Sequence, residues 1–188
     1  MSKYIRFSQI WTIVKMHFYV SVVAMFMGML MPGFVVGSVK HIASLIFIFI
    51  YMLVLYSKSE DIASHDKKQY TPDVPYIWKG LLLPVGVFVV WGILYALFYF
   101  TWKYDIINSF SGFTNNFLFV FWNYVYIGFM NMMDGKFNAW ALILVFIIPL
   151  IACGGGYMAG YKGFDISRKV ANIVYDKKEE KEDDSQEG

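Results

Sequence analysis

Long apolar stretches alternate with shorter polar ones along the chain. A helix rises about 1.5 Å per residue, so about 20 apolar residues cross the hydrocarbon core of a bilayer. Four stretches reach or approach this length, and we expect each to form a transmembrane helix: residues 16–37, 40–57, 80–101 and 137–160. The second is the shortest, because its uninterrupted apolar run covers only residues 42–56. The pattern predicts an all-α integral membrane protein with four transmembrane helices.

A fifth apolar run, residues 117–133, is interrupted by Asn123 and Asn131, and the basic residues decide whether it crosses. Lys and Arg accumulate on the cytoplasmic side of membranes. With four crossings and a cytoplasmic N-terminus, thirteen of the 16 Lys and Arg residues lie inside and three lie outside. Five crossings would place eight on each side. We therefore predict four spans, with the N- and C-termini both in the cytoplasm.

The segment between the third and fourth spans, residues 105–136, is rich in aromatic side chains. In a helix, Phe117, Phe121 and Tyr124 share one face. We expect an interfacial or re-entrant helix at the outer leaflet, which caps a cavity, touches lipid or binds a partner. We assign two sets of aromatic residues to a lipid or partner surface: Trp91, Tyr95 and Tyr99 in the third span, and Phe117, Phe121, Trp122 and Tyr124 in the outer segment. A flat ligand stacked on the third-span set is the alternative.

Two polar stretches complete the predicted organisation. Residues 57–79 are charged and contain Pro72 and Pro75, which disfavour a continuous helix, so we expect a cytoplasmic loop. Residues 1–160 then form the four-span membrane domain, and residues 161–188 form a cytoplasmic amphipathic helix followed by a charged disordered tail. The N-terminal polar residues either lie along the inner surface or extend the first span. Neither polar stretch is long enough to bury a catalytic core of its own.

Composition supports the membrane interpretation and excludes several other classes. Hydrophobic residues make up 58% of the chain and charged residues only 16%, whereas soluble domains are nearer a quarter charged. A single cysteine, Cys153, excludes an internal disulfide. A net charge of +2 without a long basic run argues against a nucleic-acid partner. The frequent use of Phe, Tyr, Ile, Met, Lys and Asn indicates an AT-rich bacterial genome.

The glycines of the fourth span raise the question of a phosphate-binding loop. The Walker motif requires Ser or Thr after its lysine, but Lys162 is followed by Gly163, so we predict no nucleotide site. Ala152, Gly156 and Gly160 instead recur every four residues and form a helix-packing stripe, as do Gly33 and Gly37 in the first span. The alternative for the fourth-span glycines is a flexible helix end.

Ionisable residues within spans usually mark function, and few are found here. Lys15 and His17 are expected near the inner boundary of the first span, where Lys15 extends to the headgroups. Asp61 and His65 stand one helical turn apart, but in a charged loop this pattern is ordinary for solvated side chains. We therefore predict no catalytic residues, no metal site and no cofactor.

These observations favour a non-catalytic accessory or interaction subunit of a transport, secretion or envelope complex in a bacterial cell membrane. Its expected partners are the lipid bilayer and either a second membrane protein or further copies of itself. One alternative is a component of an oligomeric transporter or channel, which would need a polar path. A lipid-modifying enzyme is a third class, but the sequence offers no catalytic constellation for it.

Overall fold

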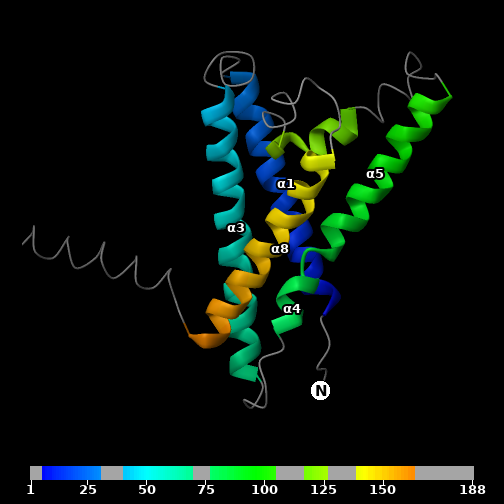
Figure 1. The fold of residues 1–188 in the computed structure, drawn as a ribbon. Helices are drawn as coiled ribbons and strands as arrows, with labels where there is room; N and C mark the ends of the chain where they lie inside the picture. Colours follow the sequence, from blue (N-terminus) through cyan, green and yellow to red (C-terminus); the bar gives the residue numbers. More distant parts are fainter. Residues whose placement is uncertain (1–5, 31–39, 70–76, 105–116, 127–138, 164–188) are drawn as a thin grey trace, which may run out of the picture.

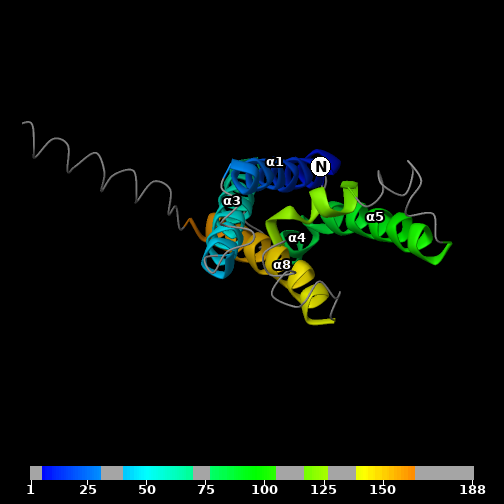
Figure 2. The same cartoon turned by 90° about the horizontal axis from the view of Figure 1, so that it is seen from above.

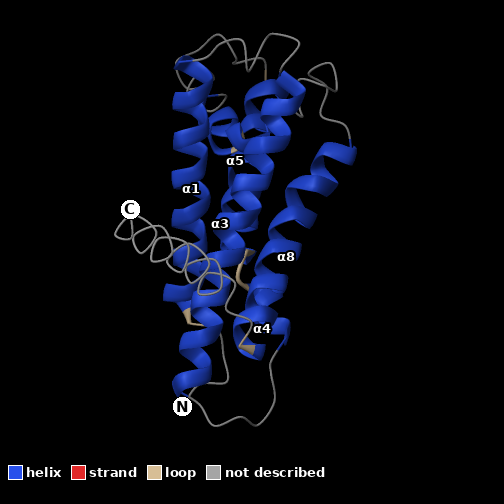
Figure 3. Ribbon diagram, turned by 90° about the vertical axis from the view of Figure 1, so that its left-hand side faces the viewer, coloured by secondary structure: helices blue, strands red, loops and turns tan. Residues whose placement is uncertain are grey.

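The computed structural model describes residues 6–30, 40–69, 77–104, 117–126 and 139–163, and the regular structure within them is helical. Residues 117–122 form one further short helix. Figure 3 shows helices and short turns, without strands, in this part of the chain. The remaining elements, in chain order, are α1 (Phe7–Leu30), α3 (Lys40–Gln69), α4 (Ile77–Leu82), α5 (Val85–Lys103), the 3₁₀ helix η1 (Tyr124–Tyr126) and α8 (Ala139–Lys162).

The long helices α1, α3, α5 and α8 run along one axis and alternate in direction (Figure 1). α1 and α5 start at the end of the molecule near the N-terminus, where α3 and α8 finish. α8 packs most extensively on α3 and also contacts α4, whereas α1 contacts α3, α5 and η1. Viewed from above, α5 leans away from the other helices (Figure 2). The up-and-down order is what short connections between antiparallel helices produce.

Three helical stretches are long and apolar enough to cross a membrane: Phe7–Leu30, Trp78–Thr101 and Ile143–Lys162. They correspond to the first, third and fourth predicted spans. α1 begins at Phe7, well before the predicted start at residue 16, so the N-terminal polar residues extend the first span. The second predicted span, residues 40–57, lies within α3, which is not one of the three stretches.

The predicted loop over residues 57–79 is wrong in its first half, because α3 continues as a helix to Gln69. The two prolines that disfavour a helix come later, at Pro72 and Pro75, and residues 57–69 contain no helix breaker. Lys58 and Asp61 also form a pair one turn apart on this extension, 2.9 Å between Nζ and Oδ2. α3 is therefore 30 residues long and carries charged residues into the helical bundle.

A turn at Leu83 and Pro84 separates α4 from α5, so the third predicted span is two helices. Proline has no amide hydrogen and its ring interferes with the preceding helical turn. The Pro84 carbonyl accepts a hydrogen bond from the Phe88 amide at 3.2 Å, which starts α5. By contrast, Pro149 lies inside α8 and the helix continues through it.

α8 ends at a glycine. Gly163 has φ of +78°, a left-handed conformation that side chains disfavour, and its amide donates to the Gly160 carbonyl at 3.2 Å. The predicted amphipathic helix and charged tail beyond residue 163 lie outside the described residues, as do Gly33 and Gly37 and most of the outer segment.

The core lies between α1, α3, α5 and α8 and contains both aliphatic and aromatic side chains. Ile13, Tyr51, Leu55 and Leu83 are fully buried in it. The outward faces of the same helices carry large exposed apolar residues, among them Phe26 on α1 and Phe49 on α3. Such faces are expected where lipid rather than water surrounds a helix.

Candidate functional site

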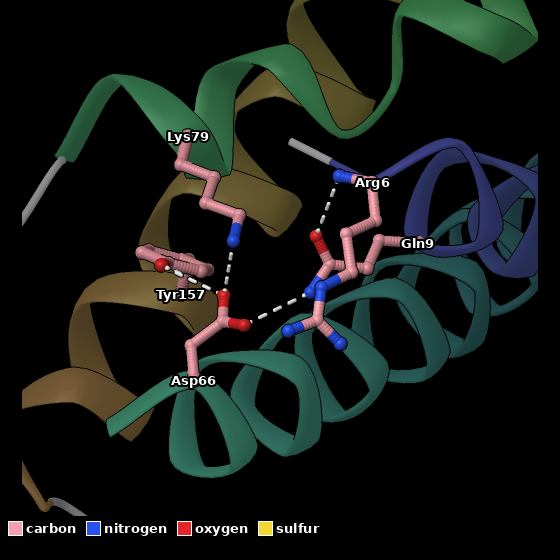
Figure 4. A network of polar contacts seen from close by, with 5 residues as sticks. All are labelled: Arg6, Gln9, Asp66, Lys79 and Tyr157. Atoms are coloured by element: carbon pink, nitrogen blue, oxygen red, sulfur yellow. Dashed lines mark hydrogen bonds and ion pairs between the residues drawn. The ribbon is translucent and has the colours of Figure 1, made fainter. Parts of the chain in front are cut away.

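Two groups of buried polar side chains join helices that are distant in sequence. The Asp66 cluster consists of Arg6, Gln9, Asp66, Lys79 and Tyr157, and lies at the end of the molecule near the N-terminus (Figure 4). The His17 cluster, in the interior of the bundle, is defined by the residues His17, Ser21, Tyr51, Trp122 and Tyr126.

A buried ion pair forms the centre of the Asp66 cluster. Asp66 lies on the helical extension of α3 and Lys79 on α4, and both residues are 6% exposed. The Lys79 Nζ atom lies 2.5 Å from Asp66 Oδ2. Removing both charges from water costs several kcal/mol per ion, so such a pair persists only with good geometry and further hydrogen bonds.

Two further donors supply those hydrogen bonds. The Tyr157 hydroxyl of α8 donates to Asp66 Oδ2 at 3.1 Å, and the Gln9 amide of α1 donates to Oδ1 at 3.0 Å. Gln9 is itself oriented, because its Oε1 accepts from the Arg6 backbone amide at 3.1 Å. Figure 4 shows the Arg6 side chain extending alongside Gln9 toward Asp66. The carboxylate thus links α1, α3, α4 and α8 at one point.

The His17 cluster is built around a histidine in the middle of α1. His17 is 1% exposed, so it does not occupy the boundary position expected from the sequence. Its Nδ1 lies 2.8 Å from the Tyr51 hydroxyl of α3, and its Nε2 lies 3.0 Å from the Trp122 carbonyl oxygen. The Ser21 hydroxyl donates to the same carbonyl at 3.0 Å. The sequence expectation was wrong because α1 starts nine residues earlier than predicted.

These contacts supply hydrogen-bond donors to carbonyl groups in the last turn of the helix over residues 117–122. The last carbonyls of a helix lack partners within it, and a buried carbonyl without a partner is costly. His17 and Ser21 supply donors to the Trp122 carbonyl, and the Asn123 side-chain amide donates to the Phe119 carbonyl at 2.9 Å. The Trp91 indole N–H donates to Asn123 Oδ1 at 3.1 Å. Side chains from α1 and α5 therefore fasten this segment to the bundle.

Tyr126 lies beside these groups with its hydroxyl buried. Its ring lies edge-on to that of Tyr51, with centroids 5.7 Å apart. Its oxygen makes no hydrogen bond of good geometry among the described residues, although the Tyr51 hydroxyl lies within interaction distance of it. Burial raises the pKa of the Tyr126 hydroxyl well above its usual range, so the group is protonated at neutral pH.

The predicted stripe of small residues on α8 faces α3. A Cβ atom at Gly156 would collide with the Tyr56 carbonyl oxygen, and one at Gly160 would collide with that of Glu60. Ala152 is also buried. The backbones of α3 and α8 therefore approach so closely at these glycines that side chains would not fit. α3, which contains the second predicted span, is therefore a packing partner of this stripe.

The aromatic residues assigned to a lipid or partner surface divide into buried and exposed sets. Trp91 and Trp122 are buried, 7% and 6% exposed, so for these two the expectation is wrong: they pack against α1 and residues 117–123 rather than facing outward. Tyr95 stacks on Trp91 with centroids 5.1 Å apart. Tyr124 packs over Gly28 of α1.

Tyr99 and Phe117 are exposed, and Phe121 is partly exposed between Phe117 and Phe18. These rings remain available to lipid or to a partner. Their surface therefore consists of fewer residues than the sequence indicated.

Asp61 and His65 are both exposed on α3, and Asp61 pairs with Lys58. Within the described part of the chain, no group of three or more His, Cys, Asp or Glu side chains is placed to hold a metal ion.

Sequence reasoning missed the Asp66 cluster, although a signal for it exists. Tyr51, Leu55, Ser59 and Asp66 follow one face of α3 at helical spacing, and all are buried. That periodicity is visible only if α3 is extended beyond its apolar part.

Comparisons with protein-family models, with curated proteins and with solved structures found no match to the chain.

Proposed function

We propose that the chain crosses a bacterial cell membrane four times, with residues 40–57 of α3 as the second of the four spans and both termini in the cytoplasm. The alternating directions of α1, α3, α5 and α8 support this arrangement, as does the cytoplasmic excess of Lys and Arg. The Asp66 cluster then lies at the cytoplasmic end. Residues 117–126, at the opposite end of the bundle, belong to an interfacial or re-entrant segment on the outer side.

Within this arrangement the protein acts as a non-catalytic accessory or interaction subunit of a membrane complex for transport, secretion or envelope assembly. The Asp66 cluster is the observation that supports it. Its charged side chains are paired with each other and join four helices, so they make a rigid scaffold rather than lining an opening. The apolar outward faces of α1 and α3 leave room for lipid or for the helix of another membrane protein.

Photo-crosslinking in the native membrane tests this function. A photoreactive amino acid at Phe26, exposed on α1, should capture a different membrane protein, which also co-purifies in mild detergent. The same residue at Ala24, fully buried on that helix, is the matched control and should capture only this chain. The function is rejected if probes at Phe26, Phe49 and Phe100, exposed on α1, α3 and α5, all yield lipid adducts alone.

A component of an oligomeric transporter or channel is the second candidate, and His17 favours it. A titratable side chain in the middle of an apolar helix is uncommon and often belongs to a transport path. Native mass spectrometry followed by solute-flux measurements in liposomes distinguishes the two candidates. A stable homo-oligomer that conducts solute supports the transporter, whereas a monomer without flux removes it.

A further inference from the structure

We propose that the His17 cluster is a proton-binding site, in which the imidazole accepts one proton while the Tyr51 hydroxyl changes its hydrogen-bond partner. The site concerns groups that the proposed subunit function does not use. It rests on the positions of His17, Tyr51 and Tyr126 and on the donors and acceptors available to each.

The contacts of the neutral cluster define the tautomer of His17. The Trp122 carbonyl can only accept, so Nε2 must carry the hydrogen that it donates. Nδ1 of a neutral imidazole is then an acceptor, and the Tyr51 hydroxyl donates to it at 2.8 Å. In this state the buried Tyr126 hydroxyl lies close to the Tyr51 oxygen but makes no hydrogen bond of good geometry among the described residues.

When His17 is protonated, the hydroxyls of Tyr51 and Tyr126 can both take part in its hydrogen-bond chain. A proton on Nδ1 makes this nitrogen a donor, so the Tyr51 oxygen must accept from it. The hydroxyl hydrogen of Tyr51 then turns away from His17 by rotation about its C–O bond. The adjacent Tyr126 oxygen can accept it, which gives that hydroxyl its partner. The new N–H bond forms with a proton from hydronium, which leaves a water molecule, and no other covalent bond changes.

The surroundings both oppose and support the positive charge. Burial in an apolar bundle opposes it. The Trp122 ring lies 4.4 Å from the imidazole, close enough for a cation–π contact, and the Trp122 carbonyl bond to Nε2 strengthens when the ring is charged.

The titratable groups around the site are few. Tyr51 faces His17 from α3, Tyr126 follows from η1, and Cys153 of α8 lies close to both tyrosines. Ser21 and Trp122 contribute no ionisable group. Among the described residues, no Asp, Glu, Lys or Arg is seen in contact with the imidazole. The hydrogen bonds to Tyr51 and through it to Tyr126 are therefore the main means of holding the proton.

Histidine ¹⁵N nuclear magnetic resonance on the full chain in nanodiscs tests the site. His41 and His65 are replaced by Gln so that His17 alone reports. We expect a single Nε2–H tautomer at pH 8 and a doubly protonated ring at lower pH. Tyr126→Phe removes only the acceptor that the protonated state needs. The proton concentration at which half of His17 is protonated should therefore be about tenfold higher in this variant, equivalent to about 1.4 kcal/mol.

Tyr124→Phe is the matched control, because Tyr124 lies in η1 with Tyr126 but packs over Gly28. It should leave the proton affinity of His17 unchanged. Tyr51→Phe should reduce the affinity at least as much as Tyr126→Phe. The proposal is overturned if His17 stays neutral down to pH 5. It is equally overturned if Tyr126→Phe titrates like the parent chain while circular dichroism shows an unchanged fold.

Discussion

Asp61 and Asp66 are five residues apart on α3, yet they have opposite surroundings. The Asp61 carboxylate pairs with Lys58, and the two side chains are 60% and 41% exposed. Asp66 and Lys79 have side chains that are only 7% and 8% exposed. Water screens the first pair, whereas the second depends on its partners for nearly all its solvation. Two aspartates about one and a half turns apart on the same helix therefore contribute differently to the stability of the fold.

Asp66→Asn should destabilise the protein by about 3–5 kcal/mol, because it leaves the Lys79 ammonium buried without a counter-ion. The free energy of unfolding, measured by detergent titration in mixed micelles, gives the value. Asp61→Asn is the control on the same helix and should cost at most about 1 kcal/mol. Replacing the pair together, Asp66→Leu with Lys79→Met, should recover most of the loss. Equal effects of Asp61→Asn and Asp66→Asn would contradict a structural role for the buried pair.

The burial of Asp66 could not be predicted from its neighbours in the sequence. Glu60, Asp61, Lys67 and Lys68 surround it, and such a charged stretch ordinarily lies in water. Its burial depends on α3 continuing beyond its apolar part and on Tyr157 and Lys79 arriving from later in the chain. His17 is a similar case, because its partner Trp122 is 105 residues away.

At the scale of helices, the close contact between α3 and α8 depends on positions of α8 that have no side chain. Gly156 and Gly160 present no side chain, so the two backbones meet directly at Tyr56 and Glu60. The spacing of Ala152, Gly156 and Gly160 predicted such a face, although not which helix it meets. Gly80 of α4 approaches α8 in a comparable way at Gly154 and Tyr157, and no pattern in the sequence predicted this contact.

Gly156→Ala should cost about 1–3 kcal/mol or more, because the new methyl group meets a rigid carbonyl rather than a movable side chain. Gly155→Ala is the neighbouring control. Its added methyl lies 3.8 Å from the Tyr56 ring, an ordinary contact, and alanine favours the helix, so stability should hold or rise. Thermal unfolding followed by circular dichroism provides the comparison. A neutral Gly156→Ala variant would show that the backbones of α3 and α8 do not approach each other this closely.

The short helix over residues 117–122 is attached through Asn123, and its attachment can be tested separately. Asn123→Ala removes the acceptor of the Trp91 indole and the donor to the Phe119 carbonyl, at a cost of about 1–3 kcal/mol. The label is a cysteine at the buried position Val125 (Val125→Cys), in a chain whose own cysteine is removed by Cys153→Ala. This cysteine should react faster with a membrane-impermeant maleimide when Asn123→Ala is present than when Asn123 is intact.

Val120→Cys, at an exposed position of the same segment, is the control and should label at the same rate with or without Asn123. Protection of Val125→Cys that persists in the Asn123→Ala variant would show that other contacts fasten the segment.

At the scale of the whole molecule, the sequence predicted the helical architecture and four spans, three of which correspond to membrane-length helices. Length and hydropathy are local properties, so they can be read from the sequence. It did not predict the extension of α3, nor that Pro84 would separate two helices while Pro149 would not. Both depend on tertiary packing, which decides whether a proline ends a helix, as at Pro84, or lies within one, as at Pro149. The fourth crossing and the positions of the termini remain predictions.

Reporter fusions test that topology. A fluorescent protein that matures only in the cytoplasm should be active at either terminus, because the four-span arrangement places thirteen of the 16 Lys and Arg residues on that side. Alkaline phosphatase, which is active only outside, should work when it is inserted after residue 112 and fail at both ends. Activity of phosphatase at one terminus alone would give an odd number of crossings and contradict the arrangement.

The turn at Leu83 and Pro84 has a mechanical consequence. Lys79, on the short α4, is held by Asp66, while α5 begins after the turn and leans outward. A change in the tilt of α5 therefore need not disturb the ion pair. We therefore expect α5 to adjust its slope in bilayers of different thickness, while the charged end of the protein keeps its geometry.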